Sequence, residues 1–497
     1  METVSDSVTL RKASETSTPE CDRNSEAWHS TVPLLLTALI ILAAVIRVIA
    51  THNDLWLDEL ISLRIANAVK SPWQIFTAVH QDNNHYLNTL YLYFVKAQNY
   101  SPVYRYLSVF WGVALVPAGY WLLSRRSRVE ALILAALLAC SYPLIHFSSE
   151  ARGYAGALLG SVMACAALSH WLARESDKKT LTMGVLYGCA LVLAILSHLT
   201  ACLIWFPLTA GSLIIVARRP ERVKWFWLWA AFNSLPAIAL ATLYFLDLRF
   251  LTELGGSPMS VFHGLSRLLA LGLGWPAKDA ITVWIVALPL IALIVWRLAN
   301  EKKSGEPLSV LLALIYLVPL ICVLVMQPSF FSARYFLVFL PFLYTGLAML
   351  LAKFSRTPAR RMALAAVLAL FLAGQAHLYV KSLQVGRGQF TAALQYIMAR
   401  TPQPRIVVAS NQDFRSGVEL AYFAPRVLHN HQLLYLTREN HASFQPDWYI
   451  LHQEGDQAPG PSTLNVPGQP TWYRAAYFGA SELSGQAWTI YSHQPTN

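Results

Sequence analysis

Residues 33–50 read PLLLTALIILAAVIRVIA, an apolar run in which Arg47 carries the only charge. A helix needs about 18 such residues to cross the hydrocarbon core of a bilayer, and several comparable runs follow along the chain. Of the 497 residues, 55% are hydrophobic and 13% are charged. That charged share is about half of what an average soluble protein carries. The sequence therefore predicts a polytopic α-helical membrane protein.

The apolar runs predict about eleven transmembrane helices, and the positions of Lys and Arg orient them. If the N-terminus is cytoplasmic, basic residues fall in every cytoplasmic connection, whereas the short loops on the opposite side hold almost none. The same scattered residues account for the net charge of +11 without a nucleic-acid partner. The predicted spans lie near residues 33–50, 103–124, 129–147, 153–173, 180–198, 200–217, 225–246, 279–298, 307–326, 333–352 and 360–380.

The two ends of the chain differ from its apolar middle. Residues 1–32 are polar and rich in Ser, Thr and Glu, which predicts a disordered cytoplasmic tail and not a secretory signal. An odd number of spans places the C-terminus outside. There, residues 385–497 contain a helix-like stretch at 388–400 and strand-like runs at 405–409 and 448–451, which predict a small extracytoplasmic α/β domain. This domain has none of the six cysteines, so no disulfide framework is available to it.

The first outer loop, residues 51–102, is long for a connection in a bundle, and long ordered loops are usually functional. It begins with Leu55-Trp56-Leu57-Asp58-Glu59, which places two adjacent carboxylates just after the first span. Neighbouring side chains on a helix diverge by about 100°, so Asp58 and Glu59 cannot both point at one atom. One of them then faces a reaction centre while the other holds a cation or a backbone amide. The alternative is that Asp58 caps a helix starting at Glu59.

Four further polar residues lie on the predicted outer side. Asp82 and His85 occupy the same loop, where His85 is a candidate to orient a phosphate or bind a metal, or is an ordinary interface residue. Arg152 and Arg334 stand nearly alone on a face that otherwise avoids positive charge. Arginine is well suited to clamp phosphate, and charge in the membrane zone is costly, which favours a functional role. The alternatives are snorkelling to lipid headgroups and, for Arg152, an ion pair with Glu150.

Taken together, these features resemble the GT-C superfamily of membrane glycosyltransferases. The resemblance is to the group of protein O-mannosyltransferases and the lipid A aminoarabinose transferase, which is glycosyltransferase family 39-like. It covers roughly residues 33–380, while for 385–497 it is only architectural. One departure is that His85-Tyr86-Leu87 replaces the family's His-Pro-Pro, which makes the helix start there less rigid. The matching motifs are Trp56-Leu57-Asp58-Glu59, His85-Tyr86-Leu87-Asn88, Glu150-Ala151-Arg152-Gly153-Tyr154, and Arg334-Tyr335 followed by Pro341.

The resemblance implies an inverting glycosyltransferase in which residues 33–384 form the catalytic transmembrane domain. The donor would be a polyprenyl-phosphate sugar, and the acceptor a glycolipid, polysaccharide or protein on the outer face of a bacterial inner membrane. Asp58 is then the candidate base, and the leaving phosphate needs fixed cations. Because some relatives need a metal and others do not, a divalent cation stays open. Glu59 is implied as a catalytic residue beside Asp58, where Glu59 and Asp82 would bind a divalent cation or shape the sugar pocket. The residues implied in substrate binding are Asp82, His85, Arg152, Tyr154, Arg334 and Tyr335.

Two other functions compete with this interpretation. A transporter or flippase of a lipid-linked sugar predicts polar residues deep within the spans and broken helices near the midplane. The spans hold few such residues, of which Asn233 is one. A membrane-anchored binding protein, working through residues 385–497, predicts instead that loss of the Asp58 carboxylate is harmless.

Overall fold

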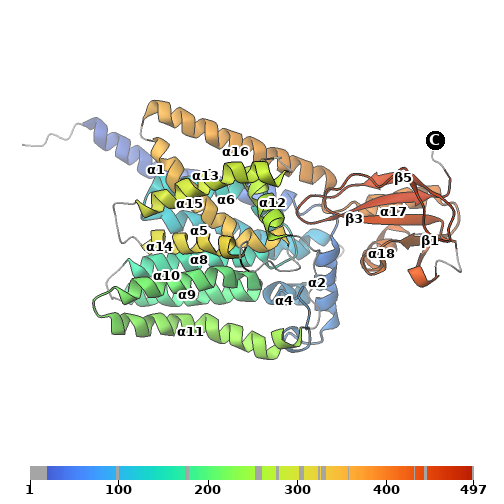
Figure 1. Cartoon of the computed structure of the whole chain (residues 1–497), viewed down its shortest axis with the longest axis horizontal. Coiled ribbons are helices and arrows are strands. Elements are labelled where there is room, and N and C mark those ends of the chain that lie inside the picture. The colour runs from blue at the N-terminus through green and yellow to red at the C-terminus, as the bar shows by residue number, and fades with distance from the viewer. Residues whose placement is uncertain are drawn as a thin grey trace, which may run out of the picture.

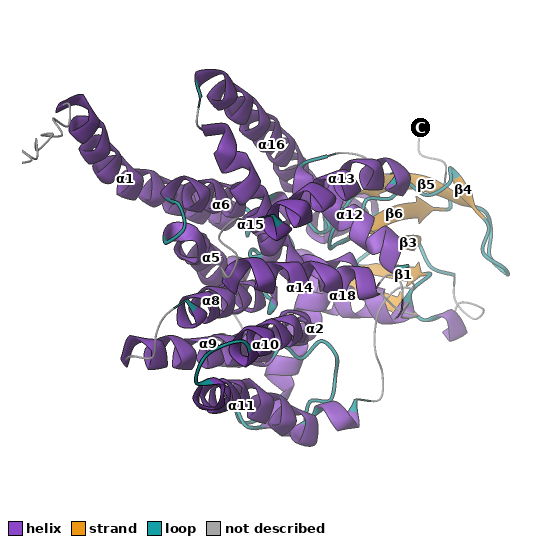
Figure 2. Ribbon diagram, turned by 60° about the vertical axis from the view of Figure 1, so that its left-hand side comes forward, coloured by secondary structure: helices purple, strands orange, loops and turns teal. Residues whose placement is uncertain are grey.

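The computed structural model consists of a helical bundle and a small domain built on a β-sheet, which lies at one end of the bundle (Figure 1). The strands are confined to that end (Figure 2). The structure describes residues 19–497 except for 97–99, 174–177, 252–259, 276–278, 301–306, 323–324, 326–331, 356, 430, 441–444 and 495–497. The predicted fold class, a polytopic helical membrane protein with a small C-terminal α/β part, is confirmed.

Each of the predicted spans coincides with a helix of the bundle. Within the described residues, 9 helices are long and apolar enough to cross a membrane. Two predicted spans correspond to shorter helices: 129–147 is divided between α6 (Arg128–Cys140) and α7 (Tyr142–Phe147), and 307–326 contains α14 (Pro307–Ile321). The helices of the other nine spans are α1 (Pro19–Ile49), α5 (Tyr106–Ser124), α8 (Tyr154–Leu172), α9 (Lys178–Ser197), α10 (Cys202–Ala217), α11 (Arg222–Leu246), α13 (Ala280–Ala299), α15 (Leu340–Leu351) and α16 (Pro358–Val385).

The first helix starts earlier than the sequence predicts. Residues 1–18 lie outside the described part of the chain, and α1 begins at Pro19, within the segment predicted to be a tail. Proline suits the first position of a helix because its missing N–H would have no partner there.

The break between α6 and α7 is stabilised by Arg47 of α1. The Arg47 guanidinium is fully buried and donates to the carbonyl oxygens of Leu138 (3.0 Å) and Ala139 (3.0 Å), which the end of α6 leaves without helical partners. Its Nε also donates to Ser148 Oγ at 2.8 Å. The break turns α7 so that the loop after it, residues 148–153, is enclosed by the bundle.

Helix α8 lies at the centre of the bundle and packs closely against α9. Of an apolar 18-residue stretch within Tyr154–Leu172, 94% is buried inside the protein. A Cβ at Gly160 would lie 2.5 Å from the Ala190 carbonyl oxygen, so the two backbones can approach this closely only because residue 160 lacks a side chain. Such small-residue contacts are typical of helix pairs in membranes. The close packing fixes both ends of the α8–α9 pair, including the end nearest the sheet domain.

The first outer loop folds into short helices at the end of the bundle that carries the sheet domain (Figure 1). These are α2 (Leu57–Ala68), α3 (Gln74–Thr77), α4 (Tyr86–Val95) and the 3₁₀ helix η1 (Ser101–Arg105). Another short apolar helix, α12 (Val261–Leu273), packs against η5 (Ala333–Phe339).

The C-terminal part contains a mixed six-stranded sheet in the order β2-β1-β3-β6-β5-β4. Strand β1 pairs in parallel with β2 and β3, and α18 connects β1 to β2, whereas the other pairs are antiparallel. The predicted helix at 388–400 and strands at 405–409 and 448–451 are confirmed. The elements are α17 (Phe390–Arg400), β1 (Arg405–Ser410), α18 (Asp413–Val427), β2 (Gln432–Leu436), β3 (Trp448–Glu454), β4 (Thr463–Leu464), β5 (Trp472–Phe478) and β6 (Gln486–Ser492).

The sheet domain packs directly against the first outer loop, because residues of that loop form part of the domain's apolar core. Leu60 and Leu63 of α2 belong to the same buried apolar cluster as Leu394 of α17 and Phe423 of α18. Helix α2, which carries the acidic pair, is therefore fixed between the bundle and the sheet domain.

Candidate active site

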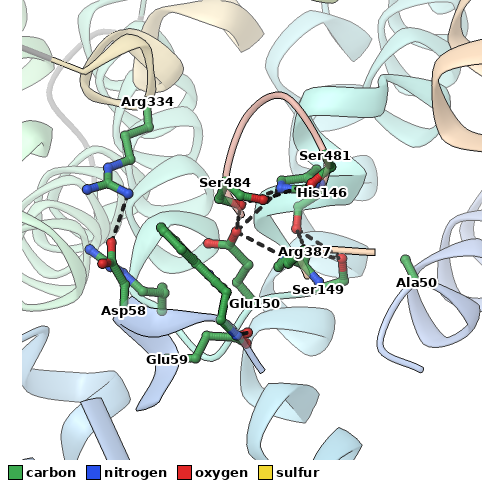
Figure 3. Close-up of polar contacts among 12 residues, drawn as sticks. Ala50, Asp58, Glu59, His146, Ser149, Glu150, Arg334, Arg387, Ser481 and Ser484 are labelled. Carbon is green, nitrogen blue, oxygen red and sulfur yellow. Dashed lines mark hydrogen bonds and ion pairs between the residues drawn. The ribbon is translucent and has the colours of Figure 1, made fainter. Parts of the chain in front are cut away.

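The Asp58 carboxylate lies between two arginines that are distant in sequence. It forms an ion pair with Nη1 of Arg152. It forms a second one, at 2.8 Å, with Nη1 of Arg334, which Figure 3 shows. The side chains of Asp58 and Arg334 are 15% and 17% exposed, so a ligand can reach them, whereas that of Arg152 is 4% exposed. Because α2 begins at Leu57 and its N-cap is Trp56, the alternative in which Asp58 caps a helix starting at Glu59 is wrong.

The two arginines provide more positive charge and more donors than Asp58 uses. Both guanidinium groups lie over the Trp56 ring, with Cζ at 5.9 Å from its centroid for Arg152 and 5.5 Å for Arg334. The Nε atoms of both arginines are buried and have no hydrogen-bond partner among the described residues. Two cations facing one carboxylate leave one excess positive charge, which favours an anionic ligand.

Glu59 faces away from this pair and holds the backbone around it. Both Glu59 and Arg105 are 0% exposed, and the Arg105 guanidinium binds both carboxylate oxygens, at 2.7 and 2.6 Å. The backbone N–H of Ala151 donates to Glu59 Oε1 at 2.8 Å, and that of Trp56 donates to Oε2 at 3.2 Å. Glu59 therefore links the start of α2 to the loop that carries Arg152.

Two further hydrogen bonds fix the backbone beside Arg152. Asn88 of α4 donates to the carbonyl oxygen of Ala151 at 2.7 Å, and Ser108 of α5 donates to that of Arg152 at 2.9 Å. Together with Glu59, three different elements hold this loop. Arg152 is thus presented to Asp58 on a rigid support, as a binding site for a charged ligand requires.

The structure brings together five of the eight predicted site residues: Asp58, His85, Arg152, Tyr154 and Arg334. The buried His85 ring lies 5.9 Å from the Tyr154 ring, and the Tyr154 ring lies 5.5 Å from Cζ of Arg152. Burial, followed by the charge of Arg152, holds the pKa of His85 well below its usual range, so its imidazole is neutral.

The other three predicted residues have different surroundings. Glu59 is buried against Arg105, as described. The Asp82 side chain is exposed, and its neighbour Asn83 makes the connection to α2 by donating to the Asp58 carbonyl oxygen at 2.9 Å. The half-buried Tyr335 packs against the core of the bundle.

The structure also shows three residues at or near the site that the sequence did not single out. Arg105 lies at the outer end of an apolar span, and an arginine at the outer end of a span is the pattern that singled out Arg152. His198, at a corner between two apolar runs, stacks on His85 with ring centroids 4.6 Å apart. Arg387 follows the last span, and only the folded chain places it beside Glu150.

Arg387 and Glu150 form the centre of a buried polar network that joins the sheet domain to the bundle (Figure 3). Arg387 Nε donates to Glu150 Oε1 at 3.1 Å, and the Ser484 hydroxyl donates to the same oxygen. Ser484 Oγ also lies 2.5 Å from Nε2 of His146 in α7. Although burial alone would raise the pKa of Glu150, the hydrogen bond to His146 and the charge of Arg387 hold it below its usual range. Glu150 is therefore an anion whose partners come from both parts of the molecule.

We expect Arg387→Ala to lower the free energy of unfolding by about 3–5 kcal/mol, because it leaves the Glu150 carboxylate buried without its counter-charge. Lys381→Ala is the matched control. Lys381 also connects α16 to the sheet domain, through Asp456, but its side chain is 42% exposed. Its loss should cost less than about 1 kcal/mol. Thermal unfolding of both purified variants measures the difference, and equal shifts would contradict the importance of the buried pair.

The adjacent carboxylates Asp58 and Glu59 are both engaged by arginines, which does not fit a divalent cation bound by this pair. The Asp58 carboxylate is paired with two arginines, and both oxygens of Glu59 are bound by Arg105. Within the described residues, no group of three or more His, Cys, Asp or Glu side chains is arranged to hold a metal ion.

Comparison with known proteins supports the fold. No protein-family model and no curated protein sequence matches the chain. Among solved structures, ArnT from Cupriavidus metallidurans in the apo state is 11% identical, with a TM-score of 0.54 over 94% of this chain and 98% of that one. The same protein bound to undecaprenyl phosphate gives a TM-score of 0.52 at 11% identity, over the same shares of the two chains. ArnT is a lipid A aminoarabinose transferase of the GT-C superfamily. The chain therefore has the same fold as ArnT, which is the fold that its resemblance to the GT-C superfamily implied.

Proposed function

We propose that the protein is an inverting glycosyltransferase that moves a sugar from a polyprenyl-phosphate donor to a hydroxyl of a glycolipid, polysaccharide or protein. The observation that carries this proposal is the Asp58 carboxylate held between Arg152 and Arg334, with one positive charge in excess. The ArnT structure with undecaprenyl phosphate, which has the same fold, supports a lipid phosphate as the donor's leaving group.

The proposed reaction is a single displacement at the anomeric carbon. Asp58 accepts the proton of the acceptor hydroxyl, whose oxygen attacks the anomeric carbon from the side opposite the phosphate. The bond between that carbon and the phosphate oxygen breaks, and the polyprenyl phosphate leaves with the electron pair. The fixed charges of Arg152 and Arg334 stabilise the negative charge that develops on the leaving oxygen.

The distribution of basic residues supports an orientation with the N-terminus in the cytoplasm and the C-terminal domain, residues 385–497, outside. In this orientation the site lies at the outer end of the bundle, next to that domain. A polyprenyl-linked donor in the outer leaflet then reaches Asp58 from the lipid phase. For a bacterial cell, this membrane is the inner membrane and the products belong to the cell envelope.

The surroundings of Asn233 weigh against the alternative of a transporter. Its side-chain oxygen accepts hydrogen bonds from Tyr187 (2.9 Å), Trp205 (3.2 Å) and Thr209 (2.9 Å), and its amide donates to the Trp229 carbonyl oxygen (2.9 Å). The polar groups of Asn233 are thus satisfied by neighbouring helices. It fits a packing role better than a place in a transport path.

The function is tested by incubating the full-length protein in lipid vesicles with a panel of radiolabelled polyprenyl-phosphate sugars and envelope acceptors. We expect one donor to be consumed, with release of one polyprenyl phosphate for each glycoside formed and inversion at the anomeric carbon. Nucleotide sugars serve as the negative control. Consumption of none of the lipid-linked donors, or transfer from a nucleotide sugar, would refute the proposal.

Within this assay, Arg334→Ala should lower kcat/KM for the donor by about 10²–10³-fold, because it removes a fixed charge from the leaving phosphate. Arg249→Ala is the matched control, since Arg249 is an exposed arginine that follows α11, and its guanidinium lies over the Phe250 ring at 4.5 Å from the centroid. A similar loss in both variants would indicate a nonspecific effect of charge on lipid binding. Full activity of Arg334→Ala would exclude Arg334 from the site.

A further inference from the structure

His198 lies at a corner of the chain that is held against the loop carrying Arg152. Helix α9 ends at Ser197, and the 3₁₀ helix η2 (Leu199–Ala201) leads into α10. A Cβ at Gly153 would overlap the Ser197 carbonyl oxygen and would lie 3.1 Å from the His85 Cβ. The corner reaches the site only because residue 153 has no side chain.

The His198 ring is part of a stack that borders the arginine pair. Its centroid lies 4.6 Å from that of His85, with an interplanar angle of 24°, and 4.3 Å from that of Tyr154, at 30°. The stack fixes the plane of the ring, and the ring retains a small exposed fraction of 9%. The packing therefore fixes the orientation of the His198 side chain, which is a requirement for a residue that binds a ligand. His198 does not belong to any of the sequence motifs that contain the other site residues.

The hydrogen bond to Thr200 determines where the ring carries its proton. The backbone N–H of Thr200 donates to Nδ1 of His198 at 3.2 Å. A backbone amide can only donate, so Nδ1 has a free electron pair and the neutral ring carries its hydrogen on Nε2. Burial, and then the charges of Arg152 and Arg334, hold the pKa of His198 well below its usual range. The hydrogen bonds that the ring makes to described residues, those to the backbone N–H and the hydroxyl of Thr200, are both at Nδ1.

Several donors near the His198 ring lack an acceptor among the described residues. Trp56 Nε1, Arg152 Nε and Arg334 Nε are buried without a hydrogen-bond partner, and each of these groups can only donate. Buried donors in native proteins are normally paired. A group of unpaired donors next to an excess positive charge fits a ligand that supplies only acceptors, which is the chemistry of a phosphate.

We propose that His198 is a donor-binding residue whose Nε2–H group donates a hydrogen bond to a phosphate oxygen of the lipid donor held by Arg152 and Arg334. This inference rests on the proposed function and adds a neutral contact to the two charged ones. A neutral hydrogen-bond donor orients the phosphate without adding positive charge to the site. The polyprenyl phosphate product is therefore not bound more tightly by a third cation when it is released.

Glutamine and asparagine substitutions test the proposal, because they reproduce different atoms of the ring. The amide nitrogen of glutamine reaches the position of Nε2, whereas that of asparagine reaches only the position of Nδ1. We expect His198→Ala and His198→Asn to weaken binding of undecaprenyl phosphate and to lower kcat/KM for the donor, both by about 10–100-fold. His198→Gln should stay within about threefold of the wild type by the same reasoning.

His263→Ala is the control, since His263 is an exposed histidine of α12 and this variant should bind undecaprenyl phosphate like the wild type. If His198→Asn is active and His198→Gln is not, the important ring atom is Nδ1, and His198 stabilises the turn between α9 and α10 without binding the phosphate. That result overturns the proposal. Wild-type binding by His198→Ala, or an equal loss in all three variants of His198, overturns it as well. If the wild-type protein binds no polyprenyl phosphate at all, the proposed function itself fails.

Discussion

Asp58→Asn is expected to lower the transfer rate by about 10²–10⁴-fold while leaving the affinity for polyprenyl phosphate intact or increased. Asparagine has nearly the same shape as aspartate and can accept hydrogen bonds from Arg152 and Arg334, but it cannot take the proton of the acceptor hydroxyl. Removal of the carboxylate also raises the excess charge at the site from one to two, which favours a bound phosphate. A fall in kcat without a loss of binding therefore separates a missing base from a misfolded site.

The matched control for this experiment is Asp279→Asn. Asp279 is an exposed aspartate at the start of α13, where its carboxylate accepts from the Thr282 backbone N–H at 2.8 Å. Asparagine caps helices as well as aspartate does, so this variant should retain wild-type activity. Transfer by Asp58→Asn at the wild-type rate would show that Asp58 is not the base.

Arg105→Ala is expected to destabilise the protein more than the loss of an ordinary ion pair, by about 3–5 kcal/mol in free energy of unfolding. The variant leaves the Glu59 carboxylate fully buried without a counter-charge. It also removes the donor to the carbonyl oxygens of Thr51 (2.6 Å), Asn53 (2.9 Å) and Asp54 (3.0 Å). Because Glu59 connects α2 to the Arg152 loop, donor binding should be lost together with stability.

Thermal unfolding of the purified protein measures this effect, with Arg126→Ala as the control. Arg126 pairs with Glu130 at 2.7 Å, one turn away at the start of α6, and both side chains are partly exposed. Its loss should cost less than about 1 kcal/mol. If the two arginine variants unfold at the same temperature, Glu59 and Arg105 do not hold the site together.

Most of the fold could be predicted because its elements follow from local patterns. A long apolar run forms a helix in a membrane wherever it occurs, and the helices of the first outer loop and the strands of the C-terminal domain follow from short-range periodicity. The predicted helix bounds differ from the structure where contacts with other elements determine the ends of a helix. The span at 129–147 is divided into α6 and α7 because Arg47, from another helix, satisfies the carbonyl groups at the break.

The site could be predicted only in part for the same reason. Asp58, Arg152 and Arg334 are each marked by a charge at the end of an apolar span, and the folded chain brings them together. The adjacency of Asp58 and Glu59 does not by itself show which of the two carboxylates faces the arginines. That depends on Arg105, which binds Glu59 in the folded chain. The position of His198 depends on the space left by Gly153, and no local pattern reveals such a contact.

The bond between Ser484 and Glu150 has a consequence for how the protein matures. The two residues are 334 positions apart, and a chain is synthesised and inserted from its N-terminus. During most of translation, the helices on either side of Glu150 have been made while Arg387 and Ser484 have not. A nascent chain that ends before Arg387 therefore holds the Glu150 carboxylate without its counter-charge, and one that ends before Ser484 lacks a further hydrogen-bond donor to it. Such chains present the kind of defect by which cellular quality control selects membrane proteins for degradation.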